Sequence, residues 1–483
     1  MGIHLTKLLP PDAEREDQTY LEKMVDLLSQ DFDFHSQDSS YASHNFHSFP
    51  AKFPPQLPHK LIQELTHSGD AVLDPMMGSG TTLLEAFLLG RYGIGFDIDP
   101  LAFLLTKTKV TSLDSRQVFQ VVRGIVESAK LAISENRSEL EKQLARRWES
   151  KTRNFVEYWF AHETQMALLA LINEIEQIPE EEIKAFCKLA FSAIIITKSG
   201  GLSLAFDLAH TRPHRAKVVF DQAGQAIIGS DLIGKQSRRI KLLTKRLHSP
   251  FDEFEKRIQQ NLKGLPKKMS DRIQPYLTGL FEPEPDRIPP RISFGDAQAL
   301  PIDDSSIDLI VTSPPYASNA IDYMRAHKFS LVWLGYAIDG LGEKRKEYIG
   351  GESTTDFVFE ALPEHTSIIV ADITKRDEKK ARVLRRYYSE RTRTLREMFR
   401  VLKPGKAAII VVGSSIMRGK DTETQICLAE IGQTIGFQVP KIGVRNLDRN
   451  RRMMPAGTHP DLDSQIQKRM HEEHIIGFYK PCA

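Results

Sequence analysis

The sequence has few cysteines, no long apolar run and almost no net charge. Cys187, Cys427 and Cys482 lie far apart and none forms a Cys-x-x-Cys pair, which argues against a disulfide framework and against a cysteine zinc site. No apolar stretch approaches the roughly 20 residues that a membrane-spanning helix needs, and the N-terminus lacks the charged-then-apolar pattern of a signal peptide. We therefore expect a soluble protein of the reducing cytoplasm, without a bound metal.

The near-neutral charge excludes one simple argument about partners. The chain of 483 residues carries 65 Lys and Arg against 63 Asp and Glu, a formal net charge of +2. Charge of this size does not by itself argue for a polyanionic partner, so any case for nucleic acid depends on where basic residues cluster. No internal repeat or low-complexity tract is visible either, which argues against a repeat architecture.

What the sequence does have is length and 41% hydrophobic residues, enough for two structural blocks. Residues 1–43 are mostly polar and are expected to form an N-terminal arm. Residues 44–112 and 288–483 alternate apolar strands with helices, which predicts one doubly wound, mostly parallel α/β sheet. Residues 113–287 show helical periodicity and are expected to form an inserted helical domain. The final apolar alternation, at residues 472–481, predicts an antiparallel edge strand.

The stretch "VLDPMMGSGTT" places Gly78 and Gly80 between an apolar strand and an apolar helix. Glycines there let the backbone approach a ligand, and the following helix offers free N–H groups. No lysine follows Gly80, so a phosphate-binding P-loop is a poor match, and Leu83 stands where a dinucleotide fingerprint needs glycine. These residues therefore favour a nucleoside ligand with a charged tail but no pyrophosphate.

Two carboxylates extend this hypothesis. Asp97 lies at the predicted end of the second strand, in "GFDIDP", where a carboxylate can accept both ribose hydroxyls, and Asp99 is the alternative for that role. Asp296, in "FGDAQALP", lies where a carboxylate could accept from an adenine amino group. An ordinary strand–helix turn with an N-capping aspartate remains open as the plainer interpretation.

A further strand, "DLIVT", ends in the turn Ser313-Pro314-Pro315-Tyr316. The prolines fix φ and lack N–H groups, so the carbonyls of Ser313 and Pro314 are held out as acceptors for an amine. Tyr316 could stack on the ring that carries the amine. A base inside a duplex is out of reach of such a turn, so a flipped base or a single strand is implied. A proline-stiffened strand exit with a structural tyrosine is the alternative.

Taken in order, "FPAKFPPQLP", "DPMMGSGTT", "GFDIDP", "GDAQALP" and "TSPPY" resemble the S-adenosylmethionine-dependent DNA amino-methyltransferases of bacterial restriction–modification systems. The resemblance covers roughly 44–112 and 288–483. The serine of the Ser-Pro-Pro-Tyr turn looks most like the cytosine-N4 branch, since adenine-N6 enzymes more often have Asp or Asn there. The resemblance implies a Rossmann-like methyltransferase fold, S-adenosyl-L-methionine as cofactor, double-stranded DNA as substrate and a cognate restriction endonuclease as a partner.

The resemblance also implies roles for individual residues. The turn would receive the target base through Ser313, Pro314, Pro315 and Tyr316. The cofactor would be bound by residues of the glycine loop, of the strand ends and of the segment that closes over it: Lys52, Phe53, Asp74, Pro75, Met77, Gly78, Ser79, Gly80, Thr81, Thr82, Asp97, Ile98, Asp296 and Ala297. The attacking amine can lose its proton after the methyl arrives, so no strong base is required.

The chain departs from the family pattern in the long interval between Gly80 and Ser313. In these families the glycine loop and the Pro-Pro-Tyr turn are usually much closer together in the sequence, unless a recognition domain intervenes. The insertion, 113–287, is accordingly our candidate for target recognition. Two basic segments compete with it for DNA contact: residues 379–400, and a cluster in the tail suited to phosphate or guanine edges. The cluster consists of Arg445, Arg449, Arg451 and Arg452. A solvated basic loop is the alternative for this cluster.

Other activities remain to be weighed. A carbon-5 cytosine methyltransferase needs a nucleophilic cysteine in a Pro-Cys turn, and only Cys482, close to the C-terminus, follows a proline. That activity is set aside. Adenine-N6 methylation of DNA, guanine-N2 methylation of RNA and a non-catalytic DNA-binding subunit stay open.

Overall fold

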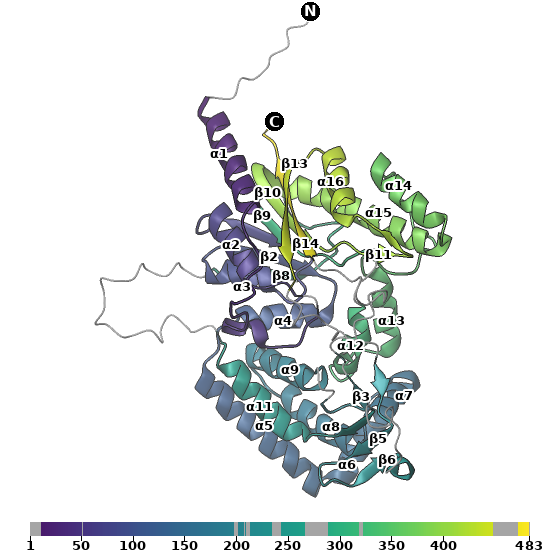
Figure 1. Ribbon diagram of the computed structural model, residues 1–483. Helices are drawn as coiled ribbons and strands as arrows, with labels where there is room; N and C mark the ends of the chain where they lie inside the picture. Colours follow the sequence, from purple (N-terminus) through teal and green to yellow (C-terminus); the bar gives the residue numbers. More distant parts are fainter. Residues whose placement is uncertain are drawn as a thin grey trace, which may run out of the picture.

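The computed structural model describes residues 11–50, 52–197, 201–206, 208, 213–233, 243–265, 288–317, 322–447 and 472–482. A seven-stranded sheet in the order β13-β14-β10-β9-β1-β2-β8 forms its centre (Figure 1). The strands are β1 (Ala71–Asp74), β2 (Tyr92–Asp97), β8 (Arg291–Phe294), β9 (Ile307–Thr312), β10 (Leu402–Val412), β13 (Gln438–Asn446) and β14 (Glu472–Lys480). The first five run parallel, and β14 is antiparallel to both β10 and β13.

This order confirms the predicted Rossmann-like, mostly parallel sheet but corrects the place of its antiparallel strand. Residues 472–480 do not form the edge, because β14 lies between β10 and β13. Its burial explains the position: Ile475 and Ile476 point to opposite faces of the sheet and both are fully buried. Strands buried on both faces read as continuous apolar runs, and the sequence around these residues is such a run.

Helices cover both faces of the sheet. Val72, Leu309 and Ile409 face one layer, and their neighbours Leu73, Ile310 and Ile410 face the other. The first layer contains α1 (Pro11–Leu28) and α2 (Gln56–Leu65), together with α3 (Thr81–Leu88). The second contains α14 (Glu364–Thr374), α15 (Glu378–Val401) and α16 (Thr424–Ile435). Because successive side chains of a strand point to opposite faces, each of these continuous apolar runs contributes to both cores.

The N-terminal segment differs from the expected arm. Met24, Leu27 and Leu28 of α1 and Phe32 just after it are buried against the sheet, beside Ile475 and Tyr479 of β14. The amphipathic face of this short helix needs an apolar partner, and the sheet provides one. This part of the segment, from about residue 20, therefore packs as part of the domain that contains the seven-stranded sheet.

The insertion is largely helical, as predicted. It contains α5 (Ser115–Glu135), α6 (Arg137–Arg146), α7 (Ser150–Trp159), α8 (His162–Glu176), α9 (Glu181–Ile195) and α11 (Pro250–Leu262). Five short strands, which the sequence analysis did not anticipate, accompany them: β3 (Ala205–Phe206), β4 (His214–Arg215), β5 (Val218–Phe220), β6 (Ala226–Ile228) and β7 (Thr244–Arg246).

The hydrophobic core of the insertion includes residues outside 113–287. It extends to α4 (Pro100–Val110), which follows β2, and to α12 (Tyr323–Leu331), which follows the Ser-Pro-Pro-Tyr turn. Phe329 and Trp333 are fully buried within it. Next along the chain, α13 (Ile338–Glu347) contacts α7. The described part of the chain contains no helix long and apolar enough to cross a membrane.

Candidate active site

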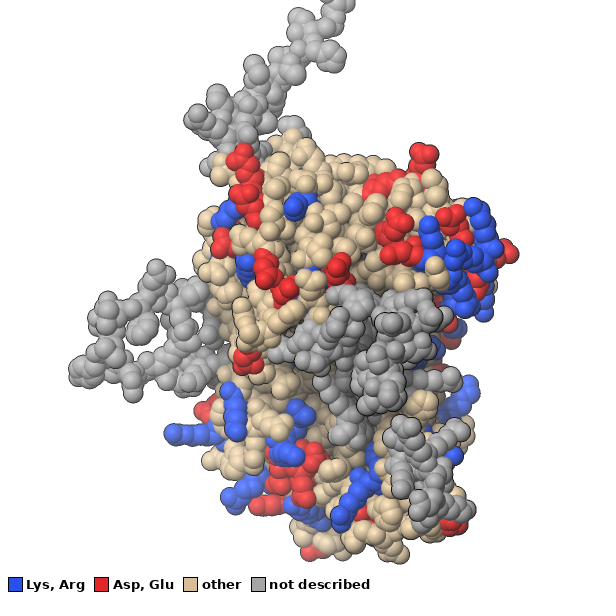
Figure 2. All heavy atoms as spheres, in the orientation of Figure 1, with Lys and Arg blue, Asp and Glu red and all other residues tan. Residues whose placement is uncertain are grey.

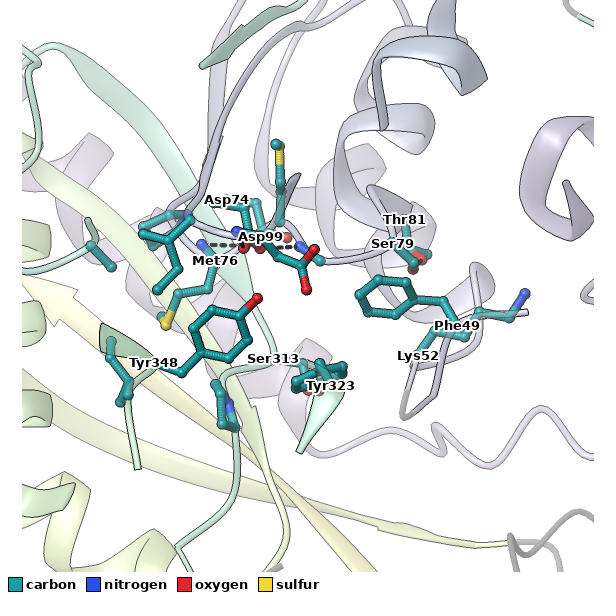
Figure 3. A pocket seen from close by; sticks show the side chains of 18 of the residues that line it. Phe49, Lys52, Asp74, Met76, Ser79, Thr81, Asp99, Ser313, Tyr323 and Tyr348 are labelled. Atoms are coloured by element: carbon teal, nitrogen blue, oxygen red, sulfur yellow. Dashed lines mark hydrogen bonds between the residues drawn. The ribbon is translucent and has the colours of Figure 1, made fainter. Parts of the chain in front are cut away.

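A pocket lies at the carboxyl ends of β1, β2, β8 and β9, which is the edge where open α/β sheets bind ligands (Figure 3). Segments far apart in the sequence meet here because four parallel strands end side by side. Most of the residues that the sequence nominated line this pocket. They are Lys52, Phe53, Asp74, Pro75, Met77, Gly78, Ser79, Thr81, Asp97, Ile98, Asp296, Ala297, Ser313 and Pro315.

The glycine loop is built around two left-handed residues. Gly78 has φ +47° and Gly80 has φ +70°, conformations that favour glycine, and the N–H of Gly80 closes a tight turn on the carbonyl of Met77 at 2.7 Å. A Cβ added to Gly80 would lie 2.5 Å from Oγ1 of Thr106 in α4. Gly80 therefore fixes the shape of the loop on the side that faces α4, and it does not line the pocket.

A buried lysine supports this loop from the same side. Lys109 of α4 is 1% exposed, and its ammonium donates to the carbonyl of Ser79 at 2.6 Å. Burial first, and then the neighbouring charge of Lys52, holds the pKa of Lys109 well below its ordinary value. Thr82, on the opposite side, donates its hydroxyl to the carbonyl of Val311 in β9. Both contacts fix the start of α3, whose first N–H groups face the ligand edge.

Asp97 joins the end of β2 to the glycine loop. Its carboxylate accepts from the N–H of Gly78 at 2.8 Å and from the N–H of Asp99 at 2.9 Å. Burial, followed by the charge of Asp99, raises the pKa of Asp97 to about 7, and burial raises that of Asp74 to about 6. A carboxylate with a raised pKa in a pocket gains from any ligand that donates hydrogen bonds to its ionised form.

Asp99, the alternative for the ribose, is already engaged. It caps α4 by accepting from the N–H groups of Leu101 and Ala102, and its other oxygen accepts from Nδ1 of His327 at 2.6 Å. Burial would raise the pKa of Asp99, but the charge and the hydrogen bond of His327 keep it below its ordinary value. The structure thus leaves Asp97 as the better placed of the two carboxylates.

The turn after β9 contributes unevenly to the pocket. Ser313 and Pro315 line it, whereas Pro314 is buried behind it and Tyr316 points its hydroxyl elsewhere, to Oε1 of Glu473 at 2.9 Å. Asp296, on the far side, accepts from the N–H of Gln298 at 2.9 Å, as in an ordinary turn after β8. The turn after β9 and the carboxylates of Asp97 and Asp296 therefore share one pocket.

Comparison with known proteins points the same way. A family model described as "DNA methylase" matches residues 12–108, the part that contains the glycine loop and Asp97. The type II methyltransferase M.MvaI of Kocuria varians is 23% identical over 93% of this chain and 92% of its own length. The type II methyltransferase M.BsoBI of Geobacillus stearothermophilus is 23% identical over 88% and 83%. The type II methyltransferase M.MjaII of Methanocaldococcus jannaschii is 32% identical over 22% and 19%.

The chain resembles the type II DNA amino-methyltransferases of restriction–modification systems over most of its length. Their cofactor is S-adenosyl-L-methionine, and the pocket fits it on its own chemistry: a glycine loop with the left-handed Gly78 at the pocket, a raised-pKa carboxylate at Asp97 and an apolar wall. The substrate of such an enzyme is DNA. Neither the family model nor these relatives' names specify cytosine-N4 or adenine-N6 as the target.

Six further residues line the pocket and were not named individually from the sequence. Three lie inside the quoted motifs, Phe49, Met76 and Gly295, and three carried no motif, Tyr323, Tyr348 and Ile349. Phe49 packs against the ring of Tyr323 at 5.4 Å and that of His327 at 5.1 Å, closing one side of the pocket (Figure 3). Phe49 stands only three positions before Lys52, so the aromatic residues flanking that lysine were a usable signal. Tyr348 had none, because it reaches the pocket only through tertiary packing.

The basic residues nominated for DNA contact have different outcomes. Arg445 is 8% exposed and bonds to Glu473 at 2.5 Å, so its guanidinium faces the protein interior. Arg449, Arg451 and Arg452 lie outside the described residues. Figure 2 shows Lys and Arg gathered at the α14–α15 end of the catalytic domain. Two of the basic residues in this region, Lys375 and Lys380, form surface ion pairs with acidic neighbours.

Proposed function

We propose that this protein transfers a methyl group from S-adenosyl-L-methionine to the exocyclic N4 amine of a flipped cytosine in duplex DNA. One observation carries the proposal: the glycine loop, Asp97 and Ser313 line the same pocket, although they come from distant parts of the sequence. A nucleoside-type cofactor site and an acceptor turn for an amine need this adjacency, since the donor and the amine must meet in line. An ordinary strand exit after β9 would not need it.

Different residues are suited to bind the cofactor and the base. Asp97 is suited to the ribose hydroxyls, Asp296 and Ala297 to the adenine, and the loop from Asp74 to Thr82, with Lys52 and Phe53 beside it, to the methionine portion. The bound cofactor supplies a methyl group on a positively charged sulfonium. The carbonyls of Ser313 and Pro314 accept from the amine of the base and turn its lone pair toward that methyl, because hydrogen-bond donation withdraws the amine from conjugation with the ring.

The chain's own contribution to rate is therefore alignment and electrostatics. Proline at positions 314 and 315 keeps the acceptor carbonyls fixed before the base arrives, and Phe49 and Tyr323 restrict water at one side. The amine loses its proton after the transfer, when its acidity is high, so the mechanism assigns no strong base. Tyr316 is the residue suited to stack on the flipped ring.

We further propose that the insertion, 113–287, reads the target sequence. Residues 379–400 and the other arginines of the cluster, Arg449, Arg451 and Arg452, are the alternative contacts. A restriction endonuclease acting on the same site is the expected biological partner. The serine at position 313 favours cytosine over adenine, because the adenine enzymes that the chain resembles more often carry Asp or Asn there. DNA adenine-N6 methylation is the second candidate function.

Nucleoside mass spectrometry tests the proposal directly. DNA from cells that express the protein should contain N4-methylcytosine, and DNA from cells that express Tyr316→Ala should not. Tyr316→Ala should still bind the cofactor product, S-adenosylhomocysteine, because its ring serves the base; Asp97→Ala should lose that binding first. N6-methyladenine in place of N4-methylcytosine would establish the second candidate instead. Wild-type DNA without either base, from a protein that also fails to bind cofactor, would refute methyl transfer altogether.

A further inference from the structure

The hydroxyl of Tyr316 is the first member of a short hydrogen-bonded chain of buried polar groups. It donates to Oε1 of Glu473 at 2.9 Å, and the other oxygen of Glu473 accepts from the guanidinium of Arg445 at 2.5 Å. Tyr316 and Glu473 are separated by 157 positions in the sequence. Both carboxylate oxygens are thus used, one for the tyrosine of the Ser-Pro-Pro-Tyr turn and one for the arginine.

The topology of the sheet brings these three residues together. Arg445, near the end of β13, is paired in register with Glu473, near the start of β14. Because β14 is antiparallel to its neighbours, its first residues lie at the same edge of the sheet as the last residues of β9 and β13. The antiparallel strand therefore delivers a carboxylate to the ligand edge, where parallel strands place their carboxyl ends.

Burial makes this contact specific. Glu473 and Arg445 are each 8% exposed, so the carboxylate depends on its two partners for the hydrogen bonds it would have in water. Burial, and then the negative charge of Glu473, hold the pKa of Tyr316 well above its ordinary value. The tyrosine hydroxyl accordingly keeps its proton and acts as the donor to the carboxylate.

We propose that Glu473 and Arg445 are positioning residues, which hold the ring of Tyr316 at the angle that the target base requires. The inference rests on the proposed function, because it assigns Tyr316 to the base. Pro314 and Pro315 restrict the backbone before the ring, while the bond to Glu473 restrains the far end of the side chain; together they leave the ring little freedom to turn. Arg445 in turn holds the carboxylate of Glu473 in place, which gives this buried arginine a purpose other than DNA contact.

The test compares Tyr316→Phe, Glu473→Ala, Arg445→Met and the double variant Tyr316→Phe with Glu473→Ala. Transfer of label from tritiated S-adenosylmethionine to unmethylated genomic DNA gives kcat, and calorimetry gives the Kd for S-adenosylhomocysteine. We expect each single variant to lower kcat by about tenfold to a hundredfold, the effect of a misaligned reacting group, with Kd within about twofold of wild type. The double variant should be no slower than the slower single variant, because both changes remove the same bond.

Tyr316→Phe keeps the inference falsifiable even if the substitutions at Glu473 or Arg445 impair folding, since it deletes one oxygen and keeps the ring. Wild-type kcat in Tyr316→Phe would overturn the positioning role. So would losses in the two single variants that multiply in the double variant, because independent losses indicate two separate structural defects. A wild-type protein that binds S-adenosylhomocysteine but labels no DNA would refute the proposed function, and the positioning role with it.

Discussion

Asp97 gives the sharpest test of the cofactor site. Its carboxylate is confined near Asp99 and Asp74, and burial, followed by the charge of Asp99, raises its pKa to about 7 from an ordinary value of 3.8. A group whose pKa is raised by folding binds its proton more tightly in the folded state. The stability it contributes is therefore complete below pH 3.8 and is lost as the pH rises through about 7.

The size of the effect follows from one proton. Each pH unit between those two values costs the folded protein ~1.4 kcal/mol, so the contribution should fall by about 2 kcal/mol between pH 5 and pH 7. Asp97→Asn removes the titrating group while keeping the shape of the side chain. The variant loses an acceptor for the N–H of Gly78 or of Asp99, but that loss is the same at every pH.

The assay is urea unfolding of both proteins, without cofactor, at pH 5, 6, 7 and 8. We expect the free energy of unfolding of wild type to decline relative to Asp97→Asn by about 2 kcal/mol from pH 5 to pH 7, and little further above pH 8. Cofactor binding should show the opposite trend in wild type, weakening about tenfold per unit below pH 7, because ribose hydroxyls donate to the ionised carboxylate. Parallel stability profiles for the two proteins would refute the raised pKa.

Three further outcomes are expected. Gly80→Ala should weaken S-adenosylhomocysteine binding at least tenfold and lower the free energy of unfolding by more than the ~1 kcal/mol that positive φ costs alanine. The control Gly69→Ala, with φ +87° and open space for a Cβ, should show only that backbone cost and bind normally. Equal effects in both variants would contradict the close contact behind the loop. Glu85→Gln should lower the free energy of unfolding by about 2 kcal/mol in urea titrations, because the buried carboxylate of Glu85 accepts from two histidines and a tyrosine. An unchanged free energy of unfolding would argue against that network. A thiol reagent should label Cys482 in the native protein and three cysteines only after unfolding, since burial raises the pKa of the other two thiols; labelling of all three in the native state would contradict their burial.

Local sequence was sufficient for much of the active site because each motif carries its own geometry. Glycines at 78 and 80 specify left-handed turns, and prolines at 314 and 315 specify a rigid strand exit, whatever surrounds them. Parallel strands then place such strand-end motifs at one edge. Asp97 and Ser313, to which the resemblance gives separate roles, therefore line one pocket.

The features that no sequence motif indicated are those whose position depends on contacts between distant segments. Strand β14 reads as an edge strand in isolation, because a run of nine residues says nothing about what lies on either side of it. The same is true of α1, whose polar flanks suggested an arm. Tyr348 and Tyr323 reach the pocket through the packing of α12 and α13 against the insertion, which no local pattern encodes.

The amino-acid sequence by itself thus indicated the kind of fold, the cofactor class and the rigid Ser-Pro-Pro-Tyr turn, since these depend on backbone chemistry over a few residues. Tertiary structure decided what holds the turn in place. The antiparallel placement of β14 brings Glu473 to Tyr316 and draws Arg445 inward, away from the DNA contact that its basic neighbours had suggested. Strand order is set by burial over the whole sheet, and this order brings the carboxylate of Glu473 within hydrogen-bond distance of Tyr316.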